Sequence, residues 1–228
     1  MDLYDVMRTT PAVREFTEDP LSDATLHRIL ENARFAPSGG NRQGTRIVVV
    51  REQETRHRLA ELNEPAVRRY VAQSAAGQSP WNPLEAPRPT PEEIAGTRVP
   101  ESFTRPVLTA AVVLVVWVDL GLVAATDQDL DRIGLVAGAS VYPLVWNVLL
   151  AARNEGYGGT ITTMAVAQEP AVRELLGVPD RFALAAVVPL GKPAKEITRL
   201  RRRPVEEIVS RERFDGEPFE APAQPSRT

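Results

Sequence analysis

The chain has 228 residues, of which 43% are hydrophobic and 25% charged, a composition typical of a globular protein with a sizeable core. Its net charge of −3 argues against nucleic acid as a partner, and the absence of cysteine excludes disulfides, thiolate catalysis and Cys-based metal sites. The two histidines, His27 and His57, lie in charged helical segments, so no metal site is predicted.

The first 50 residues predict two helices and one buried strand. Residues 3–8 form the first helix, and Pro11 follows its end because proline disfavours the helical conformation before it. Residues 13–16 are extended, and Ser22 is a suitable N-cap for a helix with apolar residues at helical spacing. The β-branched run 47–50 predicts a central strand.

A proline-rich insertion follows a helix predicted over residues 55–63. Residues 64–106 contain eight prolines together with Tyr70, Trp81 and Phe103. Such a segment is either a functional lid or a partly disordered loop. The aromatic residues favour a lid, because linkers are poor in them.

The second half predicts two strands and two helices. The apolar run 107–118 is the most buried strand expected, and residues 128–155 read as one long helix with Pro143 inside it. A helix over 169–176 and a strand over 182–190 follow. The pattern favours an α+β protein with one domain over residues 1–214 and a disordered or extended polar tail over 215–228.

The run 107–118 is too short to span a bilayer. The acidic N-terminus also lacks the basic and apolar regions of a signal peptide. We therefore expect a soluble, cytoplasmic protein without a membrane partner.

Polar residues crowd into one loop between the second helix and the first strand. Pro37, Ser38, Gly39, Asn41 and Gln43 lie there, ahead of the buried strand. Amide side chains offer donors and acceptors to the mixed edge of a heteroaromatic ring, although the same composition suits an ordinary turn.

The loop belongs to a pair of motifs that occur in a fixed order along the chain. Pro37-Ser38-x-x-Asn41-x-Gln43, preceded by Val13-Arg14-x-Phe16, resembles the opening of the nitroreductase family of FMN-dependent oxidoreductases. The resemblance implies an α/β/α sandwich with a central mixed or antiparallel sheet flanked by helices, in a homodimer. It also implies that Ser38, Asn41 and Gln43 surround the flavin ring and ribityl chain.

The resemblance further implies a phosphate site built from basic residues. Arg14 matches the family's basic run, whereas Thr10, Pro11 and Ala12 depart from it, so Arg8 and Thr10 are candidates to replace the missing groups. Near the C-terminus, Arg202 lies two residues before a proline, as the family pattern requires, and Arg201 is the second choice. The alternatives are a surface ion pair for Arg14 and a solvated basic run for the C-terminal arginines.

The glycine-rich turn 156–159 and the residues after it resemble the family segment that packs along the flavin ring. Cofactor contacts are therefore expected from Ile161, Thr162 and Thr163. Candidate substrate contacts are Arg42, Trp81, Phe103 and Tyr142. No catalytic side chain is predicted, because the flavin carries the redox chemistry.

The function implied is ping-pong transfer of hydride from NADH or NADPH, through flavin N5, to a small-molecule acceptor such as a nitro compound, quinone or flavin. Two alternatives stay open at this point. One is a flavin-dependent oxidase, dehydrogenase or flavin-fragmenting enzyme on the same scaffold. The other is a non-catalytic flavin-binding protein, which the departure at residues 10–12 favours.

Overall fold

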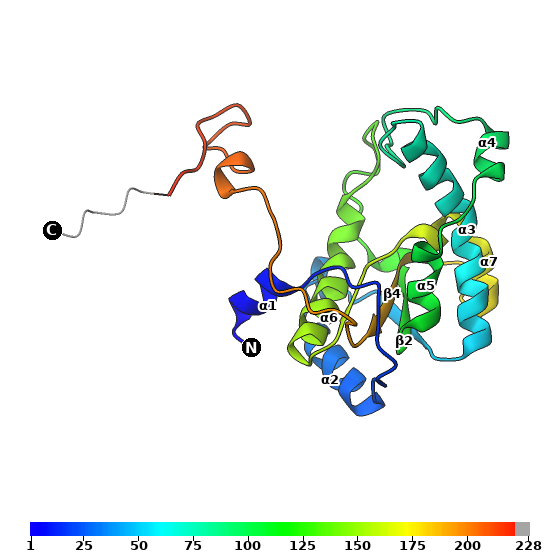
Figure 1. Cartoon of the computed structure of the whole chain (residues 1–228). Coiled ribbons are helices and arrows are strands. Elements are labelled where there is room, and N and C mark those ends of the chain that lie inside the picture. Colours follow the sequence, from blue (N-terminus) through cyan, green and yellow to red (C-terminus); the bar gives the residue numbers. More distant parts are fainter. Residues whose placement is uncertain (222–228) are drawn as a thin grey trace. The chain divides into compact units, whose positions relative to one another are not determined.

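The computed structural model describes residues 1–221, and the chain divides into two compact units, residues 1–197 and the residues from 198 onward. The first unit contains a four-stranded antiparallel sheet in the order β1-β2-β4-β3. Figure 1 labels β2 and β4, the two inner strands of this sheet. Its strands are β1 (Thr45–Val50), β2 (Val112–Asp119), β3 (Gly158–Gly159) and β4 (Phe182–Gly191). The predicted α+β class with a helix-flanked antiparallel sheet is confirmed. The central position expected for the strand over 47–50 is wrong, because among the described residues β1 pairs only with β2 at the edge of the sheet and its Val49 is 43% exposed.

Helices cover both faces of this sheet. The α-helices are α1 (Leu3–Thr9), α2 (Asp23–Ala33), α3 (Gln53–Ala75), α4 (Pro91–Gly96), α5 (Glu101–Thr109), α6 (Tyr142–Asn154) and α7 (Glu169–Leu176). Short 3₁₀ turns are η1 (Gly39–Asn41), η2 (Leu120–Leu122), η3 (Val136–Ser140), η4 (Met164–Gln168) and η5 (Val205–Glu207). Buried residues of α2 and α6 pack on one face of the sheet, and those of α3, α5 and α7 on the other.

Strand β2 supplies both hydrophobic layers because its side chains alternate between the two faces. Leu114 and Val116 belong to the α2–α6 layer, whereas Val115 and Trp117 belong to the opposite layer. In β4 a bulge changes this alternation. Its register with β2 shifts between Val116 and Trp117, so Leu184 and Ala186 pack in different layers.

Two predicted boundaries are wrong. The helix expected over 128–155 begins only at Tyr142. The buried Asp127 carboxylate accepts the backbone N–H groups of Leu135 (2.7 Å) and Val136 (3.3 Å), which withdraws both donors from α-helical hydrogen bonds, and Val136 begins the 3₁₀ turn η3. Pro143 thus lies in the first turn of α6, where proline is tolerated. The strand expected from residue 107 begins at Val112, since residues 107–109 end α5.

The proline-rich insertion is more regular than its composition indicates. Helix α3 continues through Pro65 to Ala75, and α4 and α5 occupy much of the rest. Residues 76–90 and 97–100 are the irregular parts that remain. Whether the insertion acts as a lid stays a prediction.

The second unit is small and described to residue 221. It contains η5, an isolated antiparallel bridge between Ser210 and Pro218, and the Arg211 guanidinium 4.6 Å from the Phe219 ring centroid. Part of the predicted tail, residues 222–228, lies outside the described residues. Over residues 1–221, no helix combines the length and apolarity needed to cross a membrane.

Candidate active site

Arg14 is positioned by two neighbouring segments of the first unit. The Val13 N–H donates to the Gly159 carbonyl at 2.8 Å, and the Ala194 N–H donates to the Glu15 carbonyl at 3.0 Å. Close packing here requires glycine in β3, because a Cβ on Gly159 would lie 2.4 Å from the Pro189 carbonyl oxygen. These contacts place Arg14 beside the chain that leaves β3.

That chain, residues 160–163, forms one side of a cavity of about 200 Å³. Thr162 is tied to β4, since its N–H and carbonyl both bond to Val187, at 2.9 and 2.8 Å. The cavity is lined by Arg14, Thr160, Ile161, Thr162 and Thr163, with Tyr70 and Phe103 among the residues that complete it.

Within residues 1–221, the Arg14 guanidinium has neither an ion pair nor a hydrogen bond, so the alternative of a surface ion pair is not observed. A guanidinium is suited to bidentate binding of phosphate oxygens. An exposed, uncompensated arginine beside threonine hydroxyls therefore fits an anionic group such as the FMN phosphate.

Arg8 and Thr10 are placed differently from Arg14. Thr10 is buried, and its hydroxyl donates to the Val6 carbonyl at 2.7 Å. Arg8 is exposed, with its guanidinium 5.9 Å from the Tyr4 ring centroid. Neither residue lines the Arg14 cavity, and their contribution to a phosphate site stays a prediction.

The polar loop before β1 has an unusual backbone. Asn41 and Gln43 adopt left-handed conformations with φ of 53° and 50°, next to Gly40 at 58°. The Ser38 hydroxyl accepts the Gln43 N–H at 3.0 Å, and the Gln43 side-chain amide donates to Asn41 Oδ1 at 3.2 Å. The loop thus holds the exposed Asn41 and Gln43 amides close together.

Other residues anchor this loop. The Gly39 N–H donates to the buried Ser140 hydroxyl at 3.0 Å, and the Arg42 guanidinium donates to the Val123 carbonyl at 3.2 Å. Pro37 is exposed. Tyr142, at the start of α6, is 43% exposed and donates its hydroxyl to the Ala185 carbonyl at 3.2 Å.

Loop 37–43 and the Arg14 cavity are separate in one chain. In the part that the structure describes, no hydrogen bond joins the loop to Arg14 or to residues 160–163. None of residues 37–43 lines the Arg14 cavity. The residues predicted for one flavin therefore form two distinct groups in the chain.

Two predicted substrate residues lie near the Arg14 cavity. Phe103 lines it directly, and Trp81 lines a neighbouring cavity of about 460 Å³ that shares Tyr70, Thr163 and Met164 with it. The Tyr70 and Phe103 ring centroids are 5.4 Å apart. In the sequence, Tyr70 stands out only as an aromatic residue of the insertion, and Met164 belongs to no motif that would predict its place in the site.

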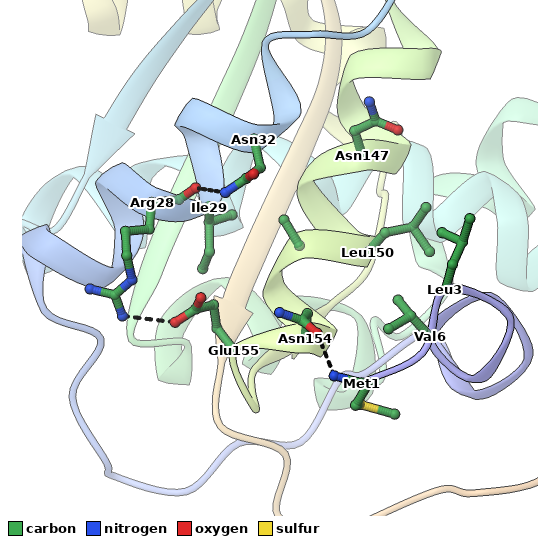
Figure 2. A pocket seen from close by; sticks show the side chains of 11 residues that line it. Met1, Leu3, Val6, Arg28, Ile29, Asn32, Asn147, Leu150, Asn154 and Glu155 are labelled. Atoms are coloured by element: carbon green, nitrogen blue, oxygen red, sulfur yellow. Dashed lines mark hydrogen bonds and ion pairs between the residues drawn. The ribbon is translucent and has the colours of Figure 1, made fainter.

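A further cavity, of about 350 Å³, lies between α1, α2 and α6 (Figure 2). Arg28 forms an ion pair of 2.7 Å with Glu155 there, and the charged N-terminal amine donates to the neutral Asn154 Oδ1 at 3.0 Å. The hydrogen bond that Arg28 donates to the Glu155 carboxylate raises the pKa of the Arg28 guanidinium. None of the predicted site residues lines this cavity.

Arg201 and Arg202 belong to the second unit, where both are exposed. The Arg202 guanidinium donates to the Arg201 carbonyl at 2.8 Å. Their predicted role at the phosphate stays a prediction.

Comparison with protein families gives a match over most of the chain. The model of the nitroreductase family matches residues 7–192. The chain belongs to the nitroreductase family. The predicted family and the prediction of a nitroreductase-family enzyme are confirmed.

Curated relatives carry two kinds of name. The NADH dehydrogenase of Thermus thermophilus is 30% identical over 198 residues, covering 87% of this chain and 90% of that protein. The iodotyrosine deiodinase of Nematostella vectensis is 24% identical over 210 residues, covering 91% of this chain and 74% of that protein.

Solved structures show the same nitroreductase fold. Oxidized iodotyrosine deiodinase bound to FMN and 3-iodo-L-tyrosine superposes with a TM-score of 0.67 at 21% identity, covering 93% of this chain and 100% of that one. The NADPH:FMN oxidoreductase of Vibrio harveyi, complexed with NAD+, has a TM-score of 0.65 at 21% identity, covering 93% and 77%.

The nitroreductase match includes both predicted groups of flavin-site residues, Arg14 with residues 161–163 and the loop 37–43. It ends at residue 192, before Arg201 and Arg202. The predicted roles of these two arginines therefore rest on their spacing to Pro204.

Proposed function

We propose that this protein is an FMN-dependent oxidoreductase that takes hydride from NADH or NADPH and then, in a ping-pong sequence, delivers electrons to a small organic acceptor. Nitro compounds, quinones and flavins are the acceptor classes proposed. Bound FMN supplies the two-electron chemistry, which is consistent with a site that needs no acid–base pair.

One observation supports this function most directly. In a chain of the nitroreductase family, Arg14 places an uncompensated guanidinium on a cavity formed by residues 160–163. Arg14 would hold the phosphate of FMN. Thr162 would keep its segment at a fixed distance from β4 through its two bonds to Val187.

A homodimer is proposed because the two groups of site residues lie apart on one protomer. The Asn41 and Gln43 amides would then contact the flavin bound in the Arg14 cavity of the partner. Exposed apolar side chains on α1 and α6 support such an association: Leu3, Tyr4, Met7, Tyr142 and Trp146 are each at least 41% exposed. An apolar surface of this kind is typical of protein–protein contacts.

The test is the anaerobic visible spectrum of the purified protein, before and after addition of NADH and then NADPH. We expect a flavin spectrum that one of the two bleaches, which would also identify the donor. A flavin spectrum that neither changes would favour an oxidase or a flavin-fragmenting enzyme. A colourless protein that does not take up added FMN would refute the proposal.

Asn41→Ala and Arg202→Ala test the flavin site itself. Both variants should retain less FMN through gel filtration than the wild type. Wild-type flavin content in both would contradict the assignment of these residues.

A further inference from the structure

The cavity beside the Arg14 cavity has an uncharged lining. Its walls include Ala66, Tyr70, Trp81, Thr163, Met164 and Ala167, and no charged residue among residues 1–221 lines it. It shares three residues with the Arg14 cavity, so a molecule bound in it lies next to the segment 160–163.

Trp81 is held firmly in this wall although 40% of it is exposed. Its backbone is left-handed, with φ of 57°, which is a genuine outlier for a bulky residue. Its N–H donates to Gln73 Oε1 at 3.0 Å, and its indole N–H donates to the Ala66 carbonyl at 3.3 Å. Strained conformations persist where the surroundings fix them, and they are concentrated at functional sites.

Two buried glutamines fix the loop that carries Trp81. Gln73 and Gln78 are 0% and 5% exposed, and Gln73 Nε2 donates to Gln78 Oε1 at 3.0 Å. Gln78 in turn donates to the Ala86 carbonyl at 2.8 Å and accepts the Arg88 N–H at 3.1 Å. The loop is therefore cross-linked by polar side chains from its start to residue 88, so Trp81 is a fixed wall.

The Arg69 side chain packs on the Trp81 ring. The Arg69 guanidinium lies 4.0 Å from the indole centroid, a distance at which cation–π attraction is strong. Arg69 does not line the cavity, whereas Trp81 does. The cation that packs on the indole is therefore not part of the cavity lining.

We propose that Trp81 determines acceptor specificity by stacking against flat, uncharged aromatic acceptors, and that Gln73 is the positioning residue that sets its orientation. This inference rests on the proposed function. A zwitterion such as an iodotyrosine finds no charged partner in the lining, so it is a poor ligand for this cavity.

The test is steady-state kinetics with two acceptors of different shape and charge. Menadione is flat and neutral, whereas ferricyanide is a non-aromatic anion. In Trp81→Ala, the ratio of kcat/KM for menadione to that for ferricyanide should fall about tenfold, mainly because KM for menadione rises. A tenfold change is about the size expected for the loss of one aromatic stacking contact. Trp81→Phe should recover most of the ratio, and Leu84→Ala, in the same loop but 91% exposed and outside the lining, should match the wild type.

Gln73→Leu removes the acceptor for the Trp81 N–H. It should raise KM for menadione more than it changes kcat, a split that a general loss of folded protein would not produce. Should this variant fail to fold, the exposed Trp81 variants still decide the question.

Charge preference is tested in the wild type with nitrobenzene and 4-nitrobenzoate. Nitrobenzene should have the lower KM. Three results would each overturn the inference and leave the proposed function standing. The first is a lower KM for 4-nitrobenzoate than for nitrobenzene, and the second is a menadione-to-ferricyanide ratio of kcat/KM in Trp81→Ala that stays within twofold of wild type. The third is a protein whose flavin is bleached by NADH or NADPH but which does not turn over menadione. Absence of that bleaching would instead refute the proposed function.

Discussion

Replacement of Arg14 by alanine should weaken FMN binding about 10–30-fold. Hydrogen bonds to charged groups contribute about 1.5–3 kcal/mol. Arg14 is exposed, so solvent screening favours the lower part of this range, and about 1.5–2 kcal/mol corresponds to that change in Kd. The FMN affinity of Arg14→Lys should lie between that of the wild type and that of Arg14→Ala, because an ammonium retains the charge but cannot bind phosphate oxygens bidentately.

The assay is titration of the apoprotein with FMN, followed by quenching of flavin fluorescence at two salt concentrations. Arg46→Ala is the matched control, because Arg46 is exposed on β1 and its loss changes net charge equally. Arg14→Ala should also show a smaller salt dependence than the wild type. If Arg14→Ala and Arg46→Ala have the same Kd, long-range charge accounts for phosphate affinity and the reasoning from the cavity is wrong.

Three further predictions concern stability. Arg56→Met should lower the free energy of unfolding in a denaturant titration by about 2–4 kcal/mol, because the buried guanidinium donates to the Ala110 carbonyl (2.6 Å) and the Ala111 carbonyl (3.0 Å). Burial also lowers the pKa of this guanidinium. A loss of less than about 1 kcal/mol would contradict the prediction. Hydrogen bonds from the Leu135 backbone and from Arg132 lower the pKa of Asp127 from 3.8 to about 2, so its contribution to stability is complete above the unfolded-state pKa and disappears as pH falls through about 2. The melting temperatures of wild type and Asp127→Asn should therefore converge as the pH falls from 5 to 2. A difference in melting temperature that stays constant over this range would refute the stabilising role of the Asp127 carboxylate. Gln43→Gly should raise the free energy of unfolding by about 0.5–1 kcal/mol, because glycine adopts the left-handed backbone conformation at this position without strain. The same variant should contain less flavin after gel filtration. Unchanged flavin content would exclude Gln43 from the site.

Local signals in the sequence were sufficient for several elements. Ser22 caps α2 as predicted, since its hydroxyl accepts the Thr25 N–H at 3.2 Å. The apolar run in β4 also predicts its strand, because burial on both faces demands continuous apolar residues. The β-branched run in β1 predicts a strand through its β propensity, although Val49 there is 43% exposed. These signals depend on neighbours within a few residues.

Other features depend on residues distant in sequence. The start of α6 is set by Asp127, which lies 15 residues earlier and withdraws two backbone N–H groups from helix formation. The fixed position of Trp81 depends on the buried Gln73 and Gln78, residues that composition alone assigns to a surface. Neither effect has a periodic signature in the sequence. The sequence therefore indicated Trp81 as a candidate residue without indicating how its side chain is held.

The candidate site owes its form to one such long-range feature, the edge of β4. Residues 158–162 run along this edge, with Gly159 paired to Leu190 and Thr162 to Val187. Just before Val187, the bulge changes which residues of β4 face each layer, and the Ala185 carbonyl accepts the Tyr142 hydroxyl. Because the pairing with β4 fixes residues 160–163, and the bond from Val13 to Gly159 fixes Arg14 beside them, the strand edge itself sets the spacing between the cation and the threonines. The alternation of apolar residues in β4 contains no sign of this bulge, which explains why the motif residues could be recognised before the cavity that they form.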